Sequence, residues 1–238
     1  MAHRAGYVNI IGRPNVGKST LLNALLGEKL VIVNAKAQTT RHRILGILNG
    51  DDHQLILSDT PGILEPAYKL QESMMQAVDE ALRDADVLLV MVELGETPEK
   101  SEELLRRARR YHGKMLVLIN KVDLGDEEKL NAAFEGWQAA FPEAVVLPIS
   151  ALHGLHVKEL RAKLIDLLPE HPAYFPKDEM SDRDMRFFIS EIIREKILGL
   201  YKQEIPYSAQ VVVNSYEESP EIVKVQADVI VMRDSQKG

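Results

Sequence analysis

An apolar run followed by a glycine-rich loop constrains the fold of this chain most strongly. Tyr7–Ile11 is a predicted buried strand, Gly12-Arg-Pro-Asn-Val-Gly17-Lys18-Ser19 follows it directly, and a predicted helix covers Ser19–Leu26. The loop fits G-x-x-x-x-G-K-[ST] in the strand–loop–helix context that identifies a phosphate-binding loop rather than a chance glycine-rich turn. Backbone N–H groups of such a loop point at the phosphates, and the positive end of the helix dipole favours their negative charge. Lys18 is then expected to reach the phosphates, and Ser19 to ligate Mg²⁺. The residues expected to bind phosphate here are Gly12, Asn15, Val16, Gly17, Lys18, Ser19 and Thr20.

Apolar runs alternate with amphipathic stretches as far as about residue 168, which predicts strands alternating with helices. The predicted buried strands are Val8–Ile11, Leu55–Leu57, Val87–Val92, Met115–Ile119 and Val145–Ile149, with Ile44–Leu48 as an edge strand. Such alternation implies right-handed crossovers and a mostly parallel sheet covered on both faces. The prediction is an α/β domain with a six-stranded sheet, whose ligands bind at the carboxyl ends of the strands.

The charge and cysteine content exclude several classes of protein. The formal net charge is −7, so the chain as a whole is not expected to coat nucleic acid, and no DNA partner is predicted. The sequence has no Cys and therefore no thiol chemistry or disulfide. No secretory leader or membrane-spanning run is evident, and a cytoplasmic location is predicted.

A second motif indicates which base is bound. Asn120-Lys-Val-Asp123 follows the strand Met115–Ile119. A carboxylate accepts hydrogen bonds from N1–H and N2–H₂ of guanine, whereas adenine offers no such pair of donors. We expect Asp123 to select guanine, the stem of Lys121 to pack over the purine, and Asn120 to tie this loop to the phosphate loop. A helix-capping loop is the structural alternative for this motif taken alone.

Two weaker motifs gain weight from their positions after strands. Asp59-Thr-Pro-Gly62 follows Leu55–Leu57, where Asp59 can hold Mg²⁺ and the Gly62 N–H can sense a γ-phosphate. Ser150-Ala151-Leu152 follows Val145–Ile149, where a Ser-Ala amide can donate to guanine O6. Each is an ordinary turn when considered alone, but the four motifs occur together and in the expected order.

Together these motifs resemble those of the Era family of translation-factor-related GTPases, over nearly the whole chain. The resemblance implies a molecular switch that hydrolyses GTP to GDP and phosphate with bound Mg²⁺. It also implies that Ala37-Gln-Thr39-Thr40-Arg41-His-Arg43 is the first switch, in which a Thr ligates Mg²⁺ when GTP is bound. Thr40 is the preferred candidate for this metal ligand, and Thr39 is the second choice. The expected metal ligands are Ser19, Thr40 and Asp59, and the expected catalytic residues are Lys18, Thr40 and Gly62.

Two residues bear on the rate of hydrolysis. Ile63 stands where many GTPases have a Gln that orients the attacking water, so slow intrinsic turnover is predicted. Asn15 leaves two alternatives open: it helps K⁺ bind near the phosphates, as in similar GTPases, or it only shapes the loop. A scaffold with negligible hydrolysis and a P-loop ATPase are the rival functions.

The composition changes after Leu168. Residues 169–180 are rich in proline and are predicted to be a linker, so that 1–168 is the GTPase domain. Ser181-Asp182 is the predicted N-cap of a helix, and strands over Ser208–Tyr216 and Ile222–Met232 follow it. Residues 181–238 resemble the start of an α+β KH domain, a single-stranded RNA-binding fold, but no G-x-x-G loop follows Ser181. The chain is therefore expected to end within that domain and to bind RNA poorly on its own.

The resemblance also implies partners. They are small-subunit ribosomal RNA of the 16S type and the 30S subunit during ribosome assembly. A peripheral association with the inner membrane is implied as well, although the sequence shows no amphipathic anchor.

Overall fold

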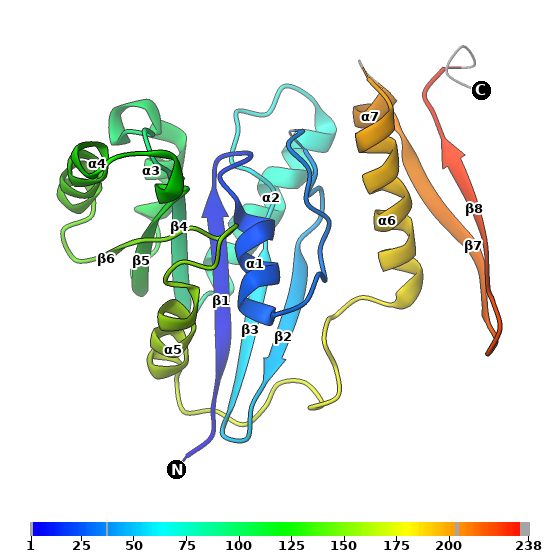
Figure 1. The fold of residues 1–238 in the computed structure, drawn as a ribbon, viewed down its shortest axis with the longest axis horizontal. Coiled ribbons are helices and arrows are strands. Elements are labelled where there is room, and N and C mark those ends of the chain that lie inside the picture. The colour runs from blue at the N-terminus through cyan, green and yellow to red at the C-terminus, as the bar shows by residue number, and fades with distance from the viewer. Residues whose placement is uncertain (1, 37, 203–204, 234–238) are drawn as a thin grey trace.

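The computed structural model describes residues 2–36, 38–202 and 205–233. Ala37 of the predicted first switch and the last five residues, Asp234–Gly238, lie outside the described residues. The described part contains a six-stranded sheet of order β2-β3-β1-β4-β5-β6 and a separate two-stranded sheet, β7-β8 (Figure 1). Among the described helices, none is long and apolar enough to cross a membrane.

The strands of the large sheet lie where the apolar runs predicted them. They are β1 (Arg4–Gly12), β2 (Ile44–Asn49), β3 (His53–Asp59), β4 (Val87–Glu93), β5 (Lys114–Asn120) and β6 (Val145–Pro148). All neighbouring pairs are parallel except β2 and β3, which form an antiparallel pair at one edge. The predicted α/β fold with a mostly parallel sheet is confirmed.

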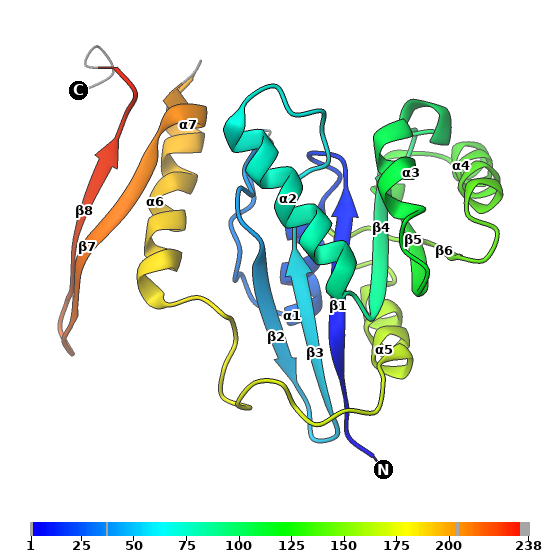
Figure 2. The same ribbon diagram turned by 180° about the vertical axis from the view of Figure 1, so that it is seen from behind.

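Helices cover both faces of this sheet and divide its core into two layers. Helices α1 (Lys18–Leu26) and α5 (Val157–Leu167) lie on one face, and α2 (Lys69–Asp84), α3 (Glu102–Ala108) and α4 (Glu127–Ala140) lie on the other (Figures 1 and 2). The central strand β4 is buried along Val87–Val92, which matches its continuous apolar sequence. Because β1, β3, β4, β5 and β6 are parallel, their carboxyl ends meet at one edge, where the loops after them form the candidate site.

The segment from residue 169 onward crosses the opposite edge and returns along β2. Gln54 Oε1 accepts hydrogen bonds from the backbone of Tyr174 (2.7 Å) and Phe175 (3.0 Å), so this segment is held against the sheet. Helix α6 (Met185–Leu200) then rises beside β2, and α7 (Ile205–Ser208), β7 (Gln210–Glu218) and β8 (Val223–Ile230) complete the chain (Figure 1).

Two sequence expectations for this part were wrong in detail. The N-cap of α6 is Asp184, whose side chain accepts from Phe187 N at 2.9 Å, and not Ser181-Asp182. Ser181 instead pairs with Gly46 of β2 and donates its hydroxyl to Leu45 O at 2.6 Å. The first predicted strand of the hairpin begins at Gln210, because residues up to Ser208 form the short helix α7.

Candidate functional site

A cavity of about 540 Å³ opens at the carboxyl edge of the large sheet. It lies between the phosphate loop, the segment after α1, and the loops that follow β3, β5 and β6. Of the predicted site residues, those that line it are Asn15, Gly17, Lys18, Ser19, Thr20, Thr40, Gly62, Asn120, Lys121, Asp123 and Leu152. The lining does not include the other predicted residues, which are Gly12, Val16, Asp59, Ser150 and Ala151.

The phosphate loop takes a conformation that only certain residues adopt easily. Gly17 has φ 106° and Asn15 has φ 65°, both in the left-handed region. A Cβ on Gly12 would lie 2.3 Å from the carbonyl oxygen of Met91, so the loop begins pressed against β4. The glycines at both ends of the motif are therefore required by geometry.

Lys18 is buried at the floor of the cavity. Its Nζ donates to the carbonyl oxygens of Gly12 (3.2 Å) and Arg13 (2.9 Å). Burial lowers the pKa of Lys18 to about 8, while the carboxylates of Asp59 and Glu96 oppose this shift. A buried cation that bonds only to neutral carbonyls is suited to receive an anionic phosphate.

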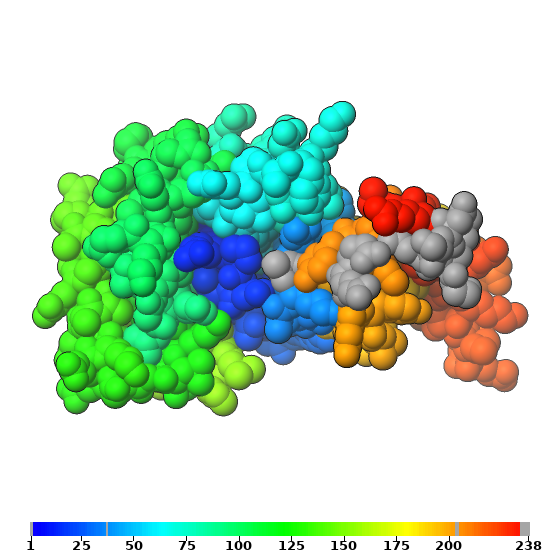
Figure 3. All heavy atoms as spheres, turned by 90° about the horizontal axis from the view of Figure 1, so that it is seen from above, coloured from blue at the N-terminus to red at the C-terminus, as the bar shows by residue number. Residues whose placement is uncertain are grey.

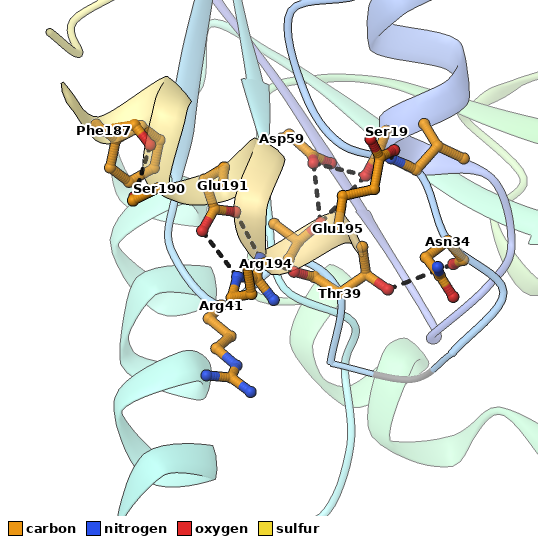
Figure 4. A network of polar contacts seen from close by, with 12 residues as sticks. Ser19, Asn34, Thr39, Arg41, Asp59, Phe187, Ser190, Glu191, Arg194 and Glu195 are labelled. Atoms are coloured by element: carbon orange, nitrogen blue, oxygen red, sulfur yellow. Dashed lines mark hydrogen bonds and ion pairs between the residues drawn. The ribbon is translucent and has the colours of Figure 1, made fainter. Parts of the chain in front are cut away.

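Ser19 and Asp59 lie close together at the start of α1 and the end of β3 (Figure 4), and Thr40 joins them. Asp59 Oδ2 accepts from Ser19 Oγ at 2.7 Å and from Thr40 Oγ1 at 3.0 Å, and the two hydroxyl oxygens are 3.1 Å apart. Asp59 is fully buried, which raises its pKa, against the hydrogen bonds from Ser19 and Thr40 and the charge of Lys18. Its Oδ1 is buried and has no hydrogen-bond partner among the described residues.

This group of oxygens fits Mg²⁺. Within the part of the chain that the structure describes, no three His, Cys, Asp or Glu side chains gather as a metal site. Mg²⁺ nevertheless does not need such a cage, because it takes one or two protein oxygens together with substrate phosphates and water. The unpaired Asp59 Oδ1 and the two hydroxyls supply hard oxygen ligands next to the phosphate loop.

The structure separates the two threonines that the sequence left as alternatives. Thr40 points its hydroxyl at Asp59, as described above. The Thr39 hydroxyl donates instead to the carbonyl oxygens of Lys36 (2.6 Å) and Asn34 (3.3 Å), within its own loop. The geometry therefore favours Thr40 as the metal ligand.

Asn120 joins three loops around the far end of the cavity. Its Nδ2 donates to Val16 O at 2.7 Å, and its Oδ1 accepts from Ala151 N at 2.9 Å. Asp123 lines the same end, and a hydrogen bond from Ser150 holds the pKa of its carboxyl below the ordinary value, with further help from His153 and Lys121. Asp123 is thus an ionised acceptor placed opposite the phosphate-binding end.

The loop after β6 and the side chain of Lys121 are not yet arranged as the sequence predicts for contact with a guanine base. The amide of Ser150 donates to Leu155 O at 3.2 Å, and that of Ala151 is engaged by Asn120, so neither is free to meet a base without rearrangement. Lys121 has φ 64°, and its Nζ pairs with Glu93. This ion pair turns the head of Lys121 toward β4 and leaves its stem at the cavity wall.

Gly62 and Ile63 hold the loop after β3 against the phosphate loop. The Ile63 N–H donates to Gly12 O at 2.9 Å, and a Cβ on Gly62 would lie 2.7 Å from Pro14. The Ile63 side chain is 3% exposed and packs in the core with α2. It faces away from any position in which it could contact water at the site.

Sequence reasoning missed one wall of the cavity. That wall comes from the segment between α1 and Thr40, and Pro14 and Leu124 also contribute. Gln38 and Thr39 line this wall, and both lie in the predicted first switch, Thr39 as the second-choice metal ligand. The lining residues that were not predicted are Pro14, Val33, Asn34, Ala35 and Leu124. Their segment has neither a motif nor a periodic pattern, so only its position between the loop and Thr40 could have indicated its role.

Comparisons with known proteins agree with this geometry. Residues 7–121 match the family model described as 50S ribosome-binding GTPase. The chain is 43% identical to the chloroplastic GTPase ERA1 of Zea mays, of which it spans 58%, and 43% identical to GTPase Era of Syntrophus aciditrophicus, of which it spans 78%. Each match covers 99% of this chain.

Solved structures of similar proteins extend the likeness to the whole described fold. One is Era in complex with MgGDPNP and nucleotides 1506–1542 of 16S ribosomal RNA, and another is a single-residue variant of Aquifex aeolicus Era bound to GDP·AlF₄⁻. Each has a TM-score of 0.91 and 36% identity, covering 98% of this chain and 80% of the other. Because these likenesses include α6, β7 and β8, the chain belongs to the Era family of GTPases, with a GTPase domain followed by a KH-like unit.

Proposed function

We propose that this protein is a guanine-nucleotide switch that binds GTP with Mg²⁺ in the described cavity and hydrolyses it slowly. The observation that carries the proposal is the division of the cavity into two ends, which Asn120 holds together. One end has Lys18 and the loop amides for phosphates, and the other has the ionised Asp123 for a guanine edge.

Each residue has a defined part in this proposal. Ser19, Thr40 and Asp59 hold Mg²⁺, which neutralises phosphate charge when bound. Lys18 and the loop amides stabilise negative charge on the phosphates. Gly62 lines the cavity, and in this proposal its N–H binds a γ-phosphate, which draws the loop after β3 toward the phosphate loop. The proposed set for nucleotide binding is the one predicted from sequence, with Val16 and Ala151 acting through their backbone.

Base preference tests the proposal directly. Removing the Asp123 carboxylate deletes two charge-assisted hydrogen bonds, so Asp123→Ala should weaken GDP binding about 100-fold or more and reduce the preference over ADP. Competition of GDP and ADP against a fluorescent GDP measures both. Glu127→Ala, an exposed carboxylate at the start of α4, is the matched control and should bind like the wild type. Equal displacement by ATP and GTP in the wild type would favour a P-loop ATPase instead.

Slow hydrolysis follows from the burial of Ile63. Without a side chain there to orient water, we expect single-turnover phosphate release far slower than in GTPases that have a Gln. Release at equal rates in KCl and NaCl of the same ionic strength would leave Asn15 with a purely structural role. No release at all would make the protein a nucleotide-dependent scaffold.

We further propose that the target is small-subunit ribosomal RNA, by analogy with the relative bound to 16S RNA. In this proposal residues 1–168 carry the nucleotide, 169–180 connect the units, and RNA contacts come from residue 181 onward. A titration of a 16S 3′-terminal oligonucleotide compares this chain with one extended to the length of its bacterial relatives. Tight binding by the shorter chain would contradict the expectation that it binds weakly.

The proposed location follows from the proposed target. We propose that the protein acts in the cytoplasm, where it would meet small-subunit ribosomal RNA, and attachment to the inner membrane surface is the finer part of the proposal. Flotation with vesicles of inner-membrane lipids tests it, and protein that stays with the unbound fraction would argue against attachment.

A further inference from the structure

A buried ion pair on α6 faces the first switch. The side chains are Glu191 and Arg194, whose residues are 8% and 3% exposed. Arg194 Nε donates to Glu191 Oε1 at 2.8 Å, and its Nη2 donates to Glu191 Oε2 at 2.5 Å. The same Nη2 also donates to the backbone carbonyl of Thr39, as Figure 4 shows.

A contribution to folding stability does not by itself explain this buried ion pair. Burying two charges carries a large desolvation penalty, and the attraction between them compensates for it only when all their hydrogen bonds are made. Among the residues that the structure describes, Arg194 Nη1 is buried and finds no partner, and neither does Nε of the neighbouring Arg41. Apolar side chains of similar size would fill the same contact at lower cost, so what the guanidinium adds is its directed bond to Thr39.

The residues on both sides of Thr40 are held from the C-terminal unit, Thr39 by its carbonyl and Arg41 by its side chain. Arg194 fixes the Thr39 carbonyl on one side. On the other side the Arg41 guanidinium donates to the carbonyl oxygens of Pro206, Tyr207 and Ala209, each at 2.9 Å. Between them, Thr40 directs its hydroxyl at Asp59.

We propose that Arg194 is a positioning residue for the nucleotide site: by holding the Thr39 carbonyl, it orients Thr40 toward the Ser19–Asp59 metal site. This inference rests on the proposed function, because it concerns the GTP- and Mg²⁺-bound form. It makes α6 part of the support for the triphosphate state, although no α6 residue lines the cavity.

The test compares nucleotide binding by the wild-type protein with binding by the Arg194→Lys variant. Lysine keeps the positive charge beside Glu191, but its single ammonium cannot reproduce the fork that serves Glu191 and Thr39 together. We expect affinity for a non-hydrolysable GTP analogue to fall about tenfold, the worth of one charge-assisted hydrogen bond. The Mg²⁺ concentration that half-saturates analogue binding should rise several-fold, while GDP affinity stays within about twofold.

Lys29→Gln is the matched control. Lys29 joins the loop after α1 to Glu195 of α6, with Nζ 2.9 Å from Oε1, so the variant loosens the same interface without touching Thr39. It should leave the analogue affinity and its Mg²⁺ dependence unchanged. If Lys29→Gln and Arg194→Lys weaken analogue and GDP binding alike, Arg194 has only a structural role and the inference is wrong.

A second variant keeps the test decisive if Arg194→Lys does not fold. Glu191→Gln retains the Arg194–Thr39 bond but removes the carboxylate that aligns the guanidinium, so a smaller shift in the same direction is expected. Wild-type protein that shows no Mg²⁺-dependent analogue binding would refute the proposed function. Wild-type binding with variants that match it would refute only the role of Arg194.

Discussion

At the scale of single residues, the conformation of Gly17 sets how closely the loops of the site can approach. A Cβ at Gly17 would lie 2.4 Å from Asn120 Nδ2, and its φ of 106° is unfavourable for other residues. Gly17→Ala should therefore displace Asn120 and break its bonds to Val16 and Ala151. We expect a loss of about 2–4 kcal/mol of stability in thermal unfolding, together with loss of GDP binding.

Gly27 offers the control for that experiment. It also has a positive φ, 82°, but a Cβ there would meet nothing within 4 Å. Gly27→Ala should therefore show backbone strain alone, about 1 kcal/mol, with GDP binding retained. Equal losses in both variants would mean that the contact with Asn120 has no role.

Glu96 is a buried carboxylate beside the phosphate loop whose titration should affect stability. Burial raises its pKa above 4.5, although hydrogen bonds from Ser101 Oγ (2.7 Å) and Glu93 N (3.3 Å) and the charge of Arg13 oppose the shift. Above the raised pKa the folded protein bears the full cost of the buried charge. As the pH falls through it, Glu96 takes up a proton before the unfolded chain does, and that cost is relieved.

Glu96→Gln removes this titration. Relative to the wild type, the variant should be more stable at pH 8 and lose that advantage toward pH 5. The difference between the two melting temperatures, followed across this range, measures the effect and cancels the titration of other groups. A difference that is constant with pH would show that Glu96 does not titrate as its burial predicts.

At the scale of elements, the N-cap of α6 controls the helix that supports the first switch. Asp184 accepts from Phe187 N at 2.9 Å. Asp184→Ala should cost about 1 kcal/mol, or a melting temperature lower by roughly 2–4 °C. Because Arg194 lies more than two turns further along α6, GDP binding should be unaffected. Ser181→Ala should lower stability through β2 instead, and a loss of α6 helicity in that variant would contradict our assignment of the cap.

The start of this helix shows which features could not be predicted from the sequence. The strands could be predicted because β1 and β4 are buried on both faces, which requires continuous apolar runs. Ser181 has a good capping side chain, but a long-range pairing with Gly46 of β2 uses it. Local propensity cannot reveal a partner so far away along the chain, and for the same reason the bond between Arg194 and Thr39 carries no signal in the sequence.

At the scale of the whole molecule, α6 connects the nucleotide site to the β7–β8 hairpin. Seen from above the carboxyl edge of the sheet, α6 and α7 lie between the first switch and the hairpin (Figure 3). Lys36, directly before the first switch, donates to the carbonyl oxygens of Leu198 and Tyr201, each at 2.5 Å, at the end of α6. We therefore expect a change in the switch that reaches Lys36 to alter these contacts and the placement of the hairpin.

The absence of Cys from the sequence makes this movement measurable. Cysteines introduced at the exposed Glu135 of α4 and Lys224 of β8 can carry a donor and an acceptor dye. We expect their energy transfer to differ between GDP and a GTP analogue with Mg²⁺, because in the proposed switch Thr40 would bind the metal only with a γ-phosphate present, and Arg194 holds the adjoining carbonyl of Thr39. A control pair at Glu135 and Lys158 of α5, both within the large-sheet unit, should give the same transfer in both states. If the first pair is equally insensitive, the hairpin is fixed to the GTPase domain and the switch signals by another route.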